Sequence, residues 1–446
     1  MKLFGTDGVR GIANRPPITP EICVRLAQAA GLEFKRGEYQ HRVAIAKDTR
    51  LSGYLIEPAL TSGFLSTGMN VILMGPLPTP AVAFLTRSLR ADLGVMISAS
   101  HNPYTDNGIK LFGPDGLKLS DEIQTRIEER FSHLPEDFPI GADLGSAMRL
   151  DDALGRYIEF VKSTFNCRQS LDSLKIVLDC ANGAAYRAAP TILWELGTEV
   201  IPIAVEPDGL NINAQCGATY PNTMRAAVLE HEAHLGIALD GDADRTIMCD
   251  ACGNILDGDA ILAIIAKSWQ EEGRLANACV ALTEMSNMAL DRYLNGMGIN
   301  VIRTKVGDRY ISSAMRKHHL NLGSEKSGHI LFGDYGILGD GLVAALQVLT
   351  VMQHTGQSLA DLAACYVPFP QCQENVHIQD RDIVHTAPIQ QMIASCSARL
   401  GTRGRLLVRP SGTEPVLRLM VESEDATLIQ SVMDEALCAL KPYMHG

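Results

Sequence analysis

The stretch Leu93-Gly94-Val95-Met96-Ile97-Ser98-Ala99-Ser100-His101-Asn102-Pro103 joins an apolar run to a polar loop. The run 93–97 predicts a strand that is buried in a sheet. The polar residues that follow therefore stand at the end of that strand, where α/β proteins place their functional sites. Ser100 is the first candidate for a reactive residue, with His101 beside it and Lys110 further along.

Strand-like and helix-like segments alternate on the N-terminal side of this stretch. Strands are predicted at 42–46 and 70–74, and helices at 53–67 and 80–87. This βαβ order predicts a mostly parallel sheet with right-handed crossovers.

The same alternation begins again at Leu174 and once more at Ala278, and the tail differs. In the tail, two strands at 403–408 and 416–422 surround a loop, and a helix follows at 426–440. The predicted fold is α/β, with three similar α/β domains whose sheets are mixed but mostly parallel, plus a smaller C-terminal α+β domain, around a central cleft. The predicted domains are 1–155, 156–254, 255–368 and 369–446.

Composition excludes several classes of function. With 46% hydrophobic and 20% charged residues, the chain has the composition of a soluble globular protein. A net charge of −12 and the lack of a dense Lys/Arg run argue against nucleic-acid binding. No apolar run approaches the roughly 18 residues of a membrane span, and the N-terminus lacks the apolar core of a signal peptide. We therefore expect a cytoplasmic protein that does not bind membranes.

A second candidate site is the stretch 240–245, which follows a predicted strand. Asp240, Asp242 and Asp244 stand at every other position, so their carboxylates can converge on one hard cation. An EF-hand loop would need glycine and glutamate where this chain has Arg245 and Ala251. Mg²⁺ fits best, because three protein oxygens leave positions open for a phosphoryl oxygen. An acidic surface turn is the alternative.

Three further polar stretches are weaker signals on their own. Arg409-Pro410-Ser411-Gly412-Thr413-Glu414-Pro415, with Arg418 shortly after, could bind a phosphate through backbone N–H groups, hydroxyls and guanidinium groups. Gly323-Ser324-Glu325-Lys326-Ser327-Gly328-His329 offers groups that often bind sugar hydroxyls. Arg10, in the glycine-rich stretch 4–11, could reach an anion near Ser100. Ordinary polar loops would also explain the first two stretches.

Several common enzyme motifs are missing from the sequence. No Walker loop, G-x-S-x-G elbow or dinucleotide-type G-x-G-x-x-G stands at a strand-to-helix turn. This weighs against ATP-binding, serine-hydrolase and NAD-dependent functions. Phosphoryl chemistry that uses a serine and a divalent cation remains.

Four stretches together resemble the α-D-phosphohexomutase superfamily, and they occur in the order of that family along nearly the whole chain. They are Ser100-His101-Asn102-Pro103 as the phosphoserine loop, 240–245 as the metal loop, 323–329 as the sugar loop and 409–415 as the phosphate loop. Within the superfamily the chain most resembles the bacterial branch that acts on glucosamine phosphates, through the stretches 4–11, 207–213 and 216–219. Ala243 and Ser324 depart from the family pattern, each replacing a frequent glycine.

The resemblance implies a role for each candidate residue. Phosphorylated Ser100 would carry the phosphoryl group, Lys110 would act as acid and base with His101 nearby, and Arg10 and Arg245 would stabilise phosphoryl charge. One Mg²⁺ per chain would bind Asp240, Asp242, Asp244 and the oxygen of Ser100. The sugar-binding residues would be Glu325, Ser327 and His329, and the residues that grip the other phosphate would be Arg409, Ser411, Gly412, Thr413 and Arg418.

The implied reaction converts glucosamine 6-phosphate to glucosamine 1-phosphate, with glucosamine 1,6-bisphosphate as intermediate and activator. The partner is then a small hexosamine phosphate, with a kinase or bisphosphate donor needed to phosphorylate Ser100. A homodimer stays open, and the C-terminal domain is expected to close over the cleft to exclude water. The alternatives are a phosphomannomutase or phosphoglucomutase on the same scaffold, a metal-dependent sugar-phosphate phosphatase and a non-catalytic sugar-phosphate sensor.

Overall fold

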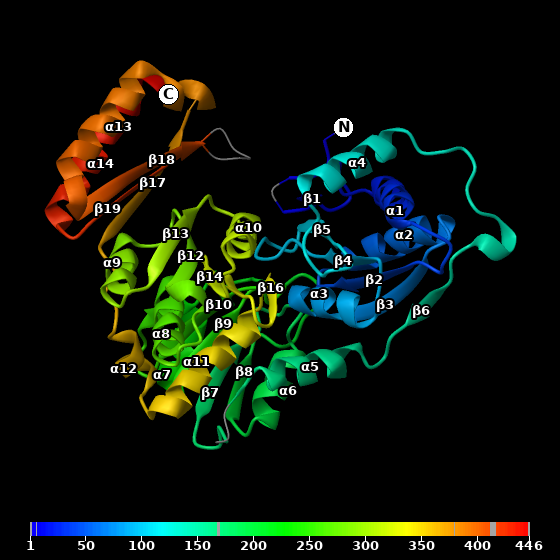
Figure 1. Cartoon of the computed structure of the whole chain (residues 1–446), viewed down its shortest axis with the longest axis horizontal. Coiled ribbons are helices and arrows are strands. Elements are labelled where there is room, and N and C mark those ends of the chain that lie inside the picture. Colours follow the sequence, from blue (N-terminus) through cyan, green and yellow to red (C-terminus); the bar gives the residue numbers. More distant parts are fainter. Residues whose placement is uncertain (1, 6, 167–169, 379, 411–415, 445–446) are drawn as a thin grey trace. The chain divides into compact units, whose positions relative to one another are not determined.

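The computed structural model describes residues 2–5, 7–166, 170–378, 380–410 and 416–444 (Figure 1). The chain forms two compact units, each described by itself below. The first unit contains Met1–Met285 and Ile299–Cys365, and the second contains Ser286–Gly298 and Tyr366–Gly446.

The first sheet of the first unit is built around the buried strand that the sequence predicts at 93–97. Its strand order is β1(Val9–Ile12), β5(Asp106–Phe112), β4(Leu93–Ile97), β2(Arg42–Lys47), β3(Asn70–Pro76) and β6(Ala147–Arg149). The neighbours from β4 to β6 pair in parallel, whereas β5 is antiparallel to both β4 and β1. All five residues of β4 are buried, because helices cover both faces of the sheet.

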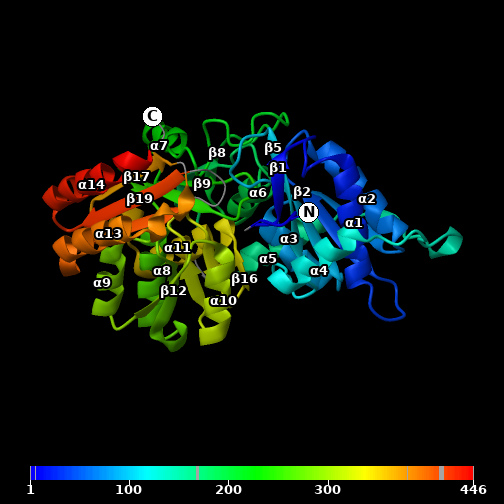
Figure 2. The same ribbon diagram turned by 90° about the horizontal axis from the view of Figure 1, so that it is seen from above.

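Helices α1(Pro20–Phe34), α2(Gly53–Ser66) and α4(Asp121–Ser132) pack together on one face of this sheet, and their apolar side chains share one core with it. Figure 2 shows α1 and α2 side by side. Helix α3(Thr79–Ser88) packs against β2 and β4 with side chains outside that core. Its position matters for the site, because its first residue lies beside the metal loop.

Two further mixed sheets complete the first unit. Their orders are β11(Ile255–Leu256), β10(Thr246–Asp250), β9(Leu235–Leu239), β7(Lys175–Asp179) and β8(Glu199–Ile203), and then β13(Asn300–Thr304), β12(Cys279–Thr283), β14(Leu322–Ser324), β15(Ile330–Phe332) and β16(Gly336–Gly339). The accompanying helices are α5(Ala153–Ser163), α6(Ala188–Glu195), α7(Asn222–Glu230), α8(Gly258–Glu271), α10(Asp308–His318), α11(Gly341–Thr355) and α12(Leu359–Ala363), with short turns η1(Gly141–Asp143) and η2(Ala276–Ala278). Helices α8 and α11 contact each other and both contact β10, and they are almost wholly buried.

The second unit is a three-stranded antiparallel sheet with helices. Its order is β17(Gln371–His377), β19(Val416–Ser423) and β18(Gly404–Pro410), and its helices are α13(Ala387–Leu400), α14(Ala426–Leu440), η3(Arg381–His385), η4(Gly401–Arg403) and η5(Lys441–Tyr443). Helix α9(Met288–Gly296) also belongs to it, although it lies far earlier in the chain. Asn287 donates to the carbonyl of Phe369 over 2.9 Å, and the N–H of Met288 donates to Glu422 over 3.0 Å.

The predicted fold class is confirmed. The structure also shows one strand–loop–strand connection that recurs in all three α/β sheets. The chain leaves the end of a parallel strand, forms a polar loop and returns as an antiparallel neighbour. This happens from β4 to β5, from β9 to β10 and from β14 to β15. The three loops are the serine loop (residues 98–105), the metal loop and the sugar loop, so the fold presents each of them at a strand's end.

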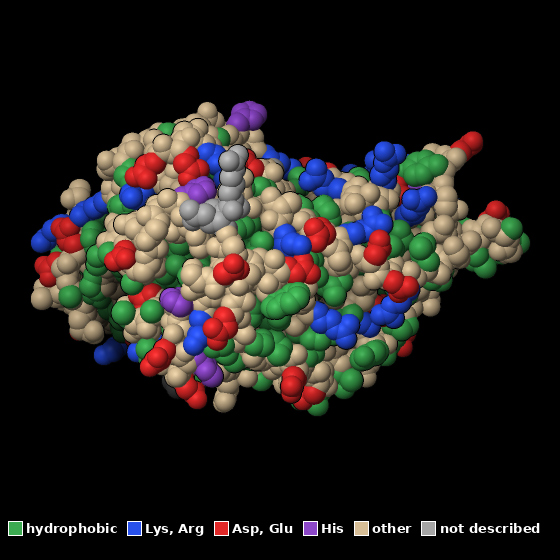
Figure 3. All heavy atoms as spheres, turned by 90° about the horizontal axis from the view of Figure 1, so that it is seen from below, with side chains coloured by type: hydrophobic (Ala, Val, Ile, Leu, Met, Phe, Trp, Pro, Cys, Tyr) green, Lys and Arg blue, Asp and Glu red, His purple; other side chains and the backbone are tan. Residues whose placement is uncertain are grey.

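Two further observations concern the surface of the molecule and the lengths of its helices. On the face shown in Figure 3, Lys and Arg side chains are interspersed with Asp and Glu. Among the described residues, no helix combines the length and apolar character needed to cross a bilayer.

Candidate active site

The serine, metal and sugar loops meet in the first unit. The hydroxyl of Ser100 donates to Oδ2 of Asp240 over 2.7 Å, which joins the serine loop to the metal loop. The N–H of Thr246 donates to the carbonyl of Gly328 over 3.0 Å, so the sugar loop lies against the strand that leaves the metal loop. The structure thus brings together three stretches that the sequence predicted separately.

Ser100 is held in an unusual conformation. Its φ is +51°, in the left-handed region that non-glycine residues seldom adopt, and only 1% of its surface is exposed. Its carbonyl accepts hydrogen bonds from Arg50 Nη2 over 2.8 Å and from Asn213 Nδ2 over 2.9 Å. These contacts offset the cost of the conformation and fix the direction of the hydroxyl.

Arg50 was missed by the sequence reasoning, yet it organises the whole serine loop. It is wholly buried, pairs with Asp48 over 2.7 Å, and donates to the carbonyls of Ser100, Asn102 and Asp106. A signal was present, because Asp48-Thr49-Arg50 follows the predicted strand 42–46 just as Ser100 follows its own strand. Parallel strands deliver such residues to the same edge of a sheet.

The metal loop holds three converging carboxylates. Ligand oxygens of Asp240, Asp242 and Asp244 all lie within 4.8 Å of one another, and the side chains are buried. Burial, and then the negative charges of Asp244 and Asp242, raise the pKa of Asp240 to about 7. Oδ1 of Asp242 is buried and has no hydrogen-bond partner among the described residues. Oδ1 of Asp244 is in the same state, and three converging carboxylates with two such oxygens fit a divalent cation.

Two helices begin at the metal loop. Thr79, the first residue of α3, donates its N–H to the carbonyl of Asp242 over 2.9 Å and its hydroxyl to Oδ2 of the same residue. Gly341, the first residue of α11, donates its N–H to the carbonyl of Ala243 over 3.0 Å. Helix N-termini carry partial positive charge, so both helices stabilise the acidic loop.

Lys110 and His101 differ in charge. Lys110 Nζ lies 2.7 Å from Asp242 and 3.3 Å from Asp244. Burial opposes its charge, but Asp242 and then Asp7 raise its pKa above the ordinary value, so Lys110 stays protonated. His101 Nδ1 lies 3.4 Å from the hydroxyl of Ser100. Burial, followed by Arg245 and Arg10, lowers the pKa of His101 to about 4, so it is neutral at neutral pH.

The two predicted arginines of the first unit both lie at this site. Arg10 donates to the carbonyl of Ala99 over 3.2 Å and pairs with Asp7. Arg245 donates its backbone N–H to Asp240 over 3.2 Å, and its Nε lies 3.9 Å from Asp244. Arg10 therefore contacts the serine loop, and Arg245 lies in the metal loop.

The sugar loop presents a carboxylate and a buried imidazole. Glu325 accepts from the N–H of Gly307 over 2.9 Å and from the hydroxyl of Ser327 over 3.2 Å. His329 places Nδ1 3.4 Å from Asp244 and Nε2 3.5 Å from Asp308. Burial opposes its protonation, but Asp244 and Asp308 outweigh it and raise the pKa of His329 to about 10.

The predicted phosphate loop lies in the second unit. Arg409 on β18 and Arg418 on β19 stand opposite each other in the antiparallel register. Ser411, Gly412 and Thr413 lie outside the described residues.

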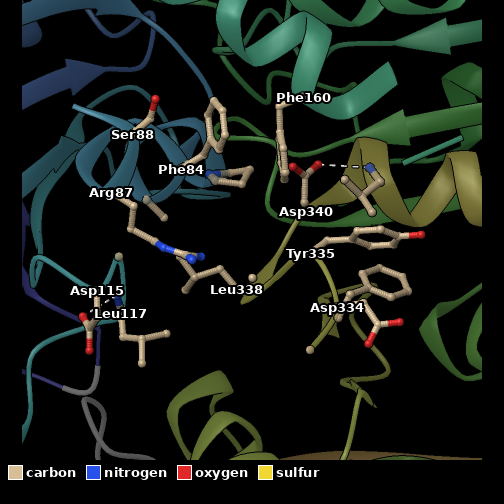
Figure 4. A pocket seen from close by; sticks show the side chains of 17 residues that line it. Phe84, Arg87, Ser88, Asp115, Leu117, Phe160, Asp334, Tyr335, Leu338 and Asp340 are labelled. Carbon is tan, nitrogen blue, oxygen red and sulfur yellow. Dashed lines mark hydrogen bonds between the residues drawn. The ribbon is translucent and has the colours of Figure 1, made fainter. Parts of the chain in front are cut away.

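Two cavities lie near these loops in the first unit. One of about 240 Å³ is lined by Asp7, Lys110, Lys118 and Asp308 among others, and so opens beside the site. A larger one of about 730 Å³, shown in Figure 4, lies between α3, Phe160 and the residues 332–340. None of the site residues named above lines it. The wall of this cavity includes Asp340, the N-cap of α11. Because the first residue of α11 donates to the metal loop, Asp340 holds the helix that contacts this loop.

Comparison with known proteins agrees with this geometry. Family models of the phosphoglucomutase/phosphomannomutase α/β/α domains I, II and III match residues 1–137, 155–253 and 257–369, and the model of the C-terminal domain matches 374–437. A protein of Rhodospirillum centenum named phosphoglucosamine mutase is 55% identical, over 99% of this chain and 95% of its own. One of the same name from Gluconacetobacter diazotrophicus is 56% identical, over 97% and 96%.

Solved structures show the same fold. A phosphoglucomutase/phosphomannomutase family protein from Burkholderia thailandensis has a TM-score of 0.83 at 22% identity, covering 99% of this chain and 97% of that one. The N-acetylphosphoglucosamine mutase of Aspergillus fumigatus, solved with GlcNAc-6P and magnesium, has a TM-score of 0.68 at 17% identity, covering 99% and 95%. The resemblance drawn from four sequence stretches is thus confirmed over the whole chain, which belongs to the phosphoglucomutase/phosphomannomutase family.

Proposed function

We propose that this chain is an intramolecular phosphotransferase that interconverts glucosamine 6-phosphate and glucosamine 1-phosphate through a phosphoserine at Ser100. The observation that carries the proposal is the 2.7 Å hydrogen bond from the buried hydroxyl of Ser100 to a cluster of three carboxylates. A hydroxyl so placed can carry a phosphoryl group whose charge a divalent cation offsets. The names of the bacterial relatives support the choice of glucosamine phosphates.

The reaction would take two phosphoryl transfers. The phosphorus–oxygen bond to Ser100 breaks while one forms to the free sugar hydroxyl, and this gives glucosamine 1,6-bisphosphate. The bisphosphate turns end for end and returns its other phosphoryl group to Ser100. In each step the attacking hydroxyl loses a proton and the leaving oxygen gains one. Lys110 is the proposed acid and base: protonated in this site, it gives a proton to the leaving oxygen of Ser100 and then accepts the proton that the attacking hydroxyl releases. Neutral His101 lies beside the transferring group.

Asp240, Asp242, Asp244 and the phosphoserine oxygen would hold one Mg²⁺, which supplies charge stabilisation at the transferring phosphoryl group. The unsatisfied Oδ1 of Asp242 supports this assignment. Arg10 and Arg245 add positive charge on the serine and metal loops.

The remaining groups would bind the substrate away from the reacting atoms. Glu325, Ser327 and His329 are proposed to bind sugar hydroxyls, and Arg409, Ser411, Gly412, Thr413 and Arg418 to grip the other phosphate. The proposal also includes the four domains with their predicted boundaries and a cytoplasmic location. A kinase or a bisphosphate donor would phosphorylate Ser100, and two chains would form a homodimer.

A phosphomannomutase or phosphoglucomutase is the second candidate, because the matching family models are described by those two activities. A coupled assay that compares glucosamine, glucose and mannose phosphates, with Mg²⁺ and the bisphosphate present, separates the two. We expect kcat/KM to favour glucosamine phosphate by more than about tenfold. A preference for glucose or mannose phosphate would reverse the choice, and steady release of inorganic phosphate would indicate a phosphatase.

A further inference from the structure

Six charged side chains form a closed ring of alternating sign that includes Asp244 of the metal loop. Each member contacts the next, and the last contacts the first. In order they are Lys110, Asp7, Lys118, Asp308, His329 and Asp244. The nitrogen–oxygen distances are 3.6 Å for Lys110–Asp7, 2.7 Å for Lys118–Asp308, 3.5 Å for His329–Asp308, 3.4 Å for His329–Asp244 and 3.3 Å for Lys110–Asp244, with Lys118–Asp7 closer still.

The alternation of charge follows from geometry. Both ring nitrogens of His329 face carboxylate oxygens, and only the protonated imidazole can donate from both. The ring then contains three cations and three anions, and it is neutral as a whole. Within the ring each charge has two neighbours of opposite sign, and two members also have a partner outside it, Asp242 for Lys110 and Arg10 for Asp7. Such pairing is needed because an unpaired buried charge is costly.

The ring joins segments that are far apart in the chain. Asp7, Lys110 and Lys118 come from the first α/β domain, Asp244 from the metal loop, and Asp308 and His329 from the third sheet region. Lys110 and His329 already have proposed chemical roles. Asp7, Lys118 and Asp308 have none so far, and Lys118 stands between the two carboxylates of this set.

Lys118 separates two groups that would otherwise repel each other. Asp7 and Asp308 are close enough for the charge of Asp7 to act on Asp308. Without the ammonium group between them, each carboxylate would turn away from the other. Asp7 would then leave Lys110, and Asp308 would leave His329.

We infer that Lys118 is a positioning residue: by holding Asp7 against Lys110 and Asp308 against His329, it fixes these two cations against the carboxylates of the metal loop. The inference rests on the proposed mutase reaction. The simpler view is that the Lys118–Asp308 ion pair only links two domains. Any ion pair at these two positions would then give the wild-type kcat.

A charge swap distinguishes the two views. In the double variant Lys118→Asp/Asp308→Lys the pair is restored, but the new lysine faces His329 and the new aspartate faces Asp7. The swap thus breaks the alternation of charge in the ring but keeps an ion pair between the two domains. Arg309→Gln is a matched control, because Arg309 follows Asp308 in sequence and pairs with Asp121 over 2.8 Å across the same two domains, outside the ring.

The experiment measures kcat and KM for glucosamine 6-phosphate in the full chain with Mg²⁺. We expect Lys118→Met to lower kcat about 10²-fold with KM changed by less than about threefold, because misplacing catalytic groups slows the chemical step. Lys118→Arg should recover most of the rate, the swap should stay as slow as Lys118→Met, and Arg309→Gln should match the wild type.

Two outcomes would overturn the inference: wild-type kcat in Lys118→Met, or recovery of wild-type kcat in the swap. If Lys118→Met does not fold, Lys118→Gln removes the same ammonium group and gives the same test, with thermal unfolding followed for every variant. Failure of the proposed function is recognised separately, because the wild type itself would then not turn over glucosamine 6-phosphate.

Discussion

Ser100 combines burial, a left-handed backbone and a hydrogen bond to Asp240. The Ser100→Ala variant should lose turnover by more than about 10³-fold, because it removes the atom that carries the phosphoryl group. The lost hydrogen bond should change the free energy of unfolding by only about 1 kcal/mol. Turnover and thermal unfolding are measured on the same preparation. Retained, Mg²⁺-dependent turnover by a folded variant would refute the role of Ser100.

Asp242 carries one of the two metal-loop carboxylate oxygens that are buried without a hydrogen-bond partner among the described residues, the other belonging to Asp244. Asp242→Asn should weaken Mg²⁺ binding by at least about tenfold, since it removes one anionic ligand. Calorimetric titration with Mg²⁺ measures this directly, and chelation should abolish turnover of the wild type. Asp151→Asn, at an exposed turn, serves as the control. Equal Mg²⁺ affinity in both variants, or full activity in chelator, would remove the metal assignment.

Sequence reasoning found some of the site residues and missed others for a physical reason. Ser100 and Asp240 each follow an apolar strand, and such a pattern is visible in one stretch of chain. Asp7 and Lys118 are single charged residues outside the helices and strands, and Asp308 is the first residue of α10. Their proposed roles depend on partners more than a hundred residues away, as in the Lys118–Asp308 pair. No local sequence pattern predicts such a contact.

At the scale of elements, the antiparallel strands were the main surprise. The sequence predicted the longer parallel strands, such as β2, β3 and β4, because each is a largely apolar run. It did not predict the short parallel strands β6 and β14, which lack such a run. Strand β5 contains Asp106, Asn107 and Lys110, so its composition resembles a loop. It is nevertheless almost entirely buried, because its polar side chains find partners: Asp106 bonds to the serine loop, Lys110 to the metal loop, and Asn107 to Ser52 before α2. Strands built around a site carry the residues of that site and lose the apolar signature.

Helix α11 depends on the buried cap Asp340. This carboxylate accepts from the N–H groups of Leu342 and Val343 and from the hydroxyl of Tyr157 over 2.9 Å. Burial raises its pKa to about 6, against about 3.9 for an exposed aspartate. Between these values the folded chain holds a proton that the unfolded chain releases. This residue therefore lowers the free energy of unfolding as pH rises from about 4 to 6, by a few kcal/mol, and has no further effect above that range.

Asp340→Asn keeps the cap and the acceptor for Tyr157 but cannot ionise. Urea unfolding at about pH 5 and pH 8 should show a smaller difference between the two pH values than in the wild type. Asp340→Ala should lose about 1–3 kcal/mol at both pH values, because the helix end and Tyr157 lose their partner. Equal pH dependence in the Asn variant and the wild type would show that Asp340 does not titrate in this way.

At the scale of the whole molecule, the second unit takes α9 from a distant part of the sequence. Asn287 and Met288 bond to Phe369 and Glu422, and Arg292 pairs with Glu424. Sequence reasoning located the helix but had no means to see which unit it joins, because its packing partners follow it by more than 80 residues.

A chain that ends at residue 368 should therefore melt at a lower temperature than the full chain, since α9 loses its partners. It should still bind Mg²⁺ with unchanged affinity, because the metal loop lies in the first unit. It should show no mutase turnover without Arg409 and Arg418. Full turnover by the truncated chain would contradict the proposed role of the second unit.

The central claim is that Ser100 carries the phosphoryl group between the two ends of the sugar. The most direct test incubates the wild type with Mg²⁺ and glucosamine 1,6-bisphosphate, and follows the peptide that contains Ser100 by mass spectrometry before and after glucosamine 6-phosphate is added. We predict one phosphate on Ser100 before the addition. If the added glucosamine 6-phosphate carries an isotope label in the oxygens of its phosphate, the phosphate on Ser100 should be exchanged for a labelled one, because each cycle gives one phosphoryl group to the sugar and returns the other to Ser100. Turnover with Ser100 unmodified throughout, or an unlabelled phosphate that stays on Ser100 while labelled substrate is converted to product, would contradict the claim.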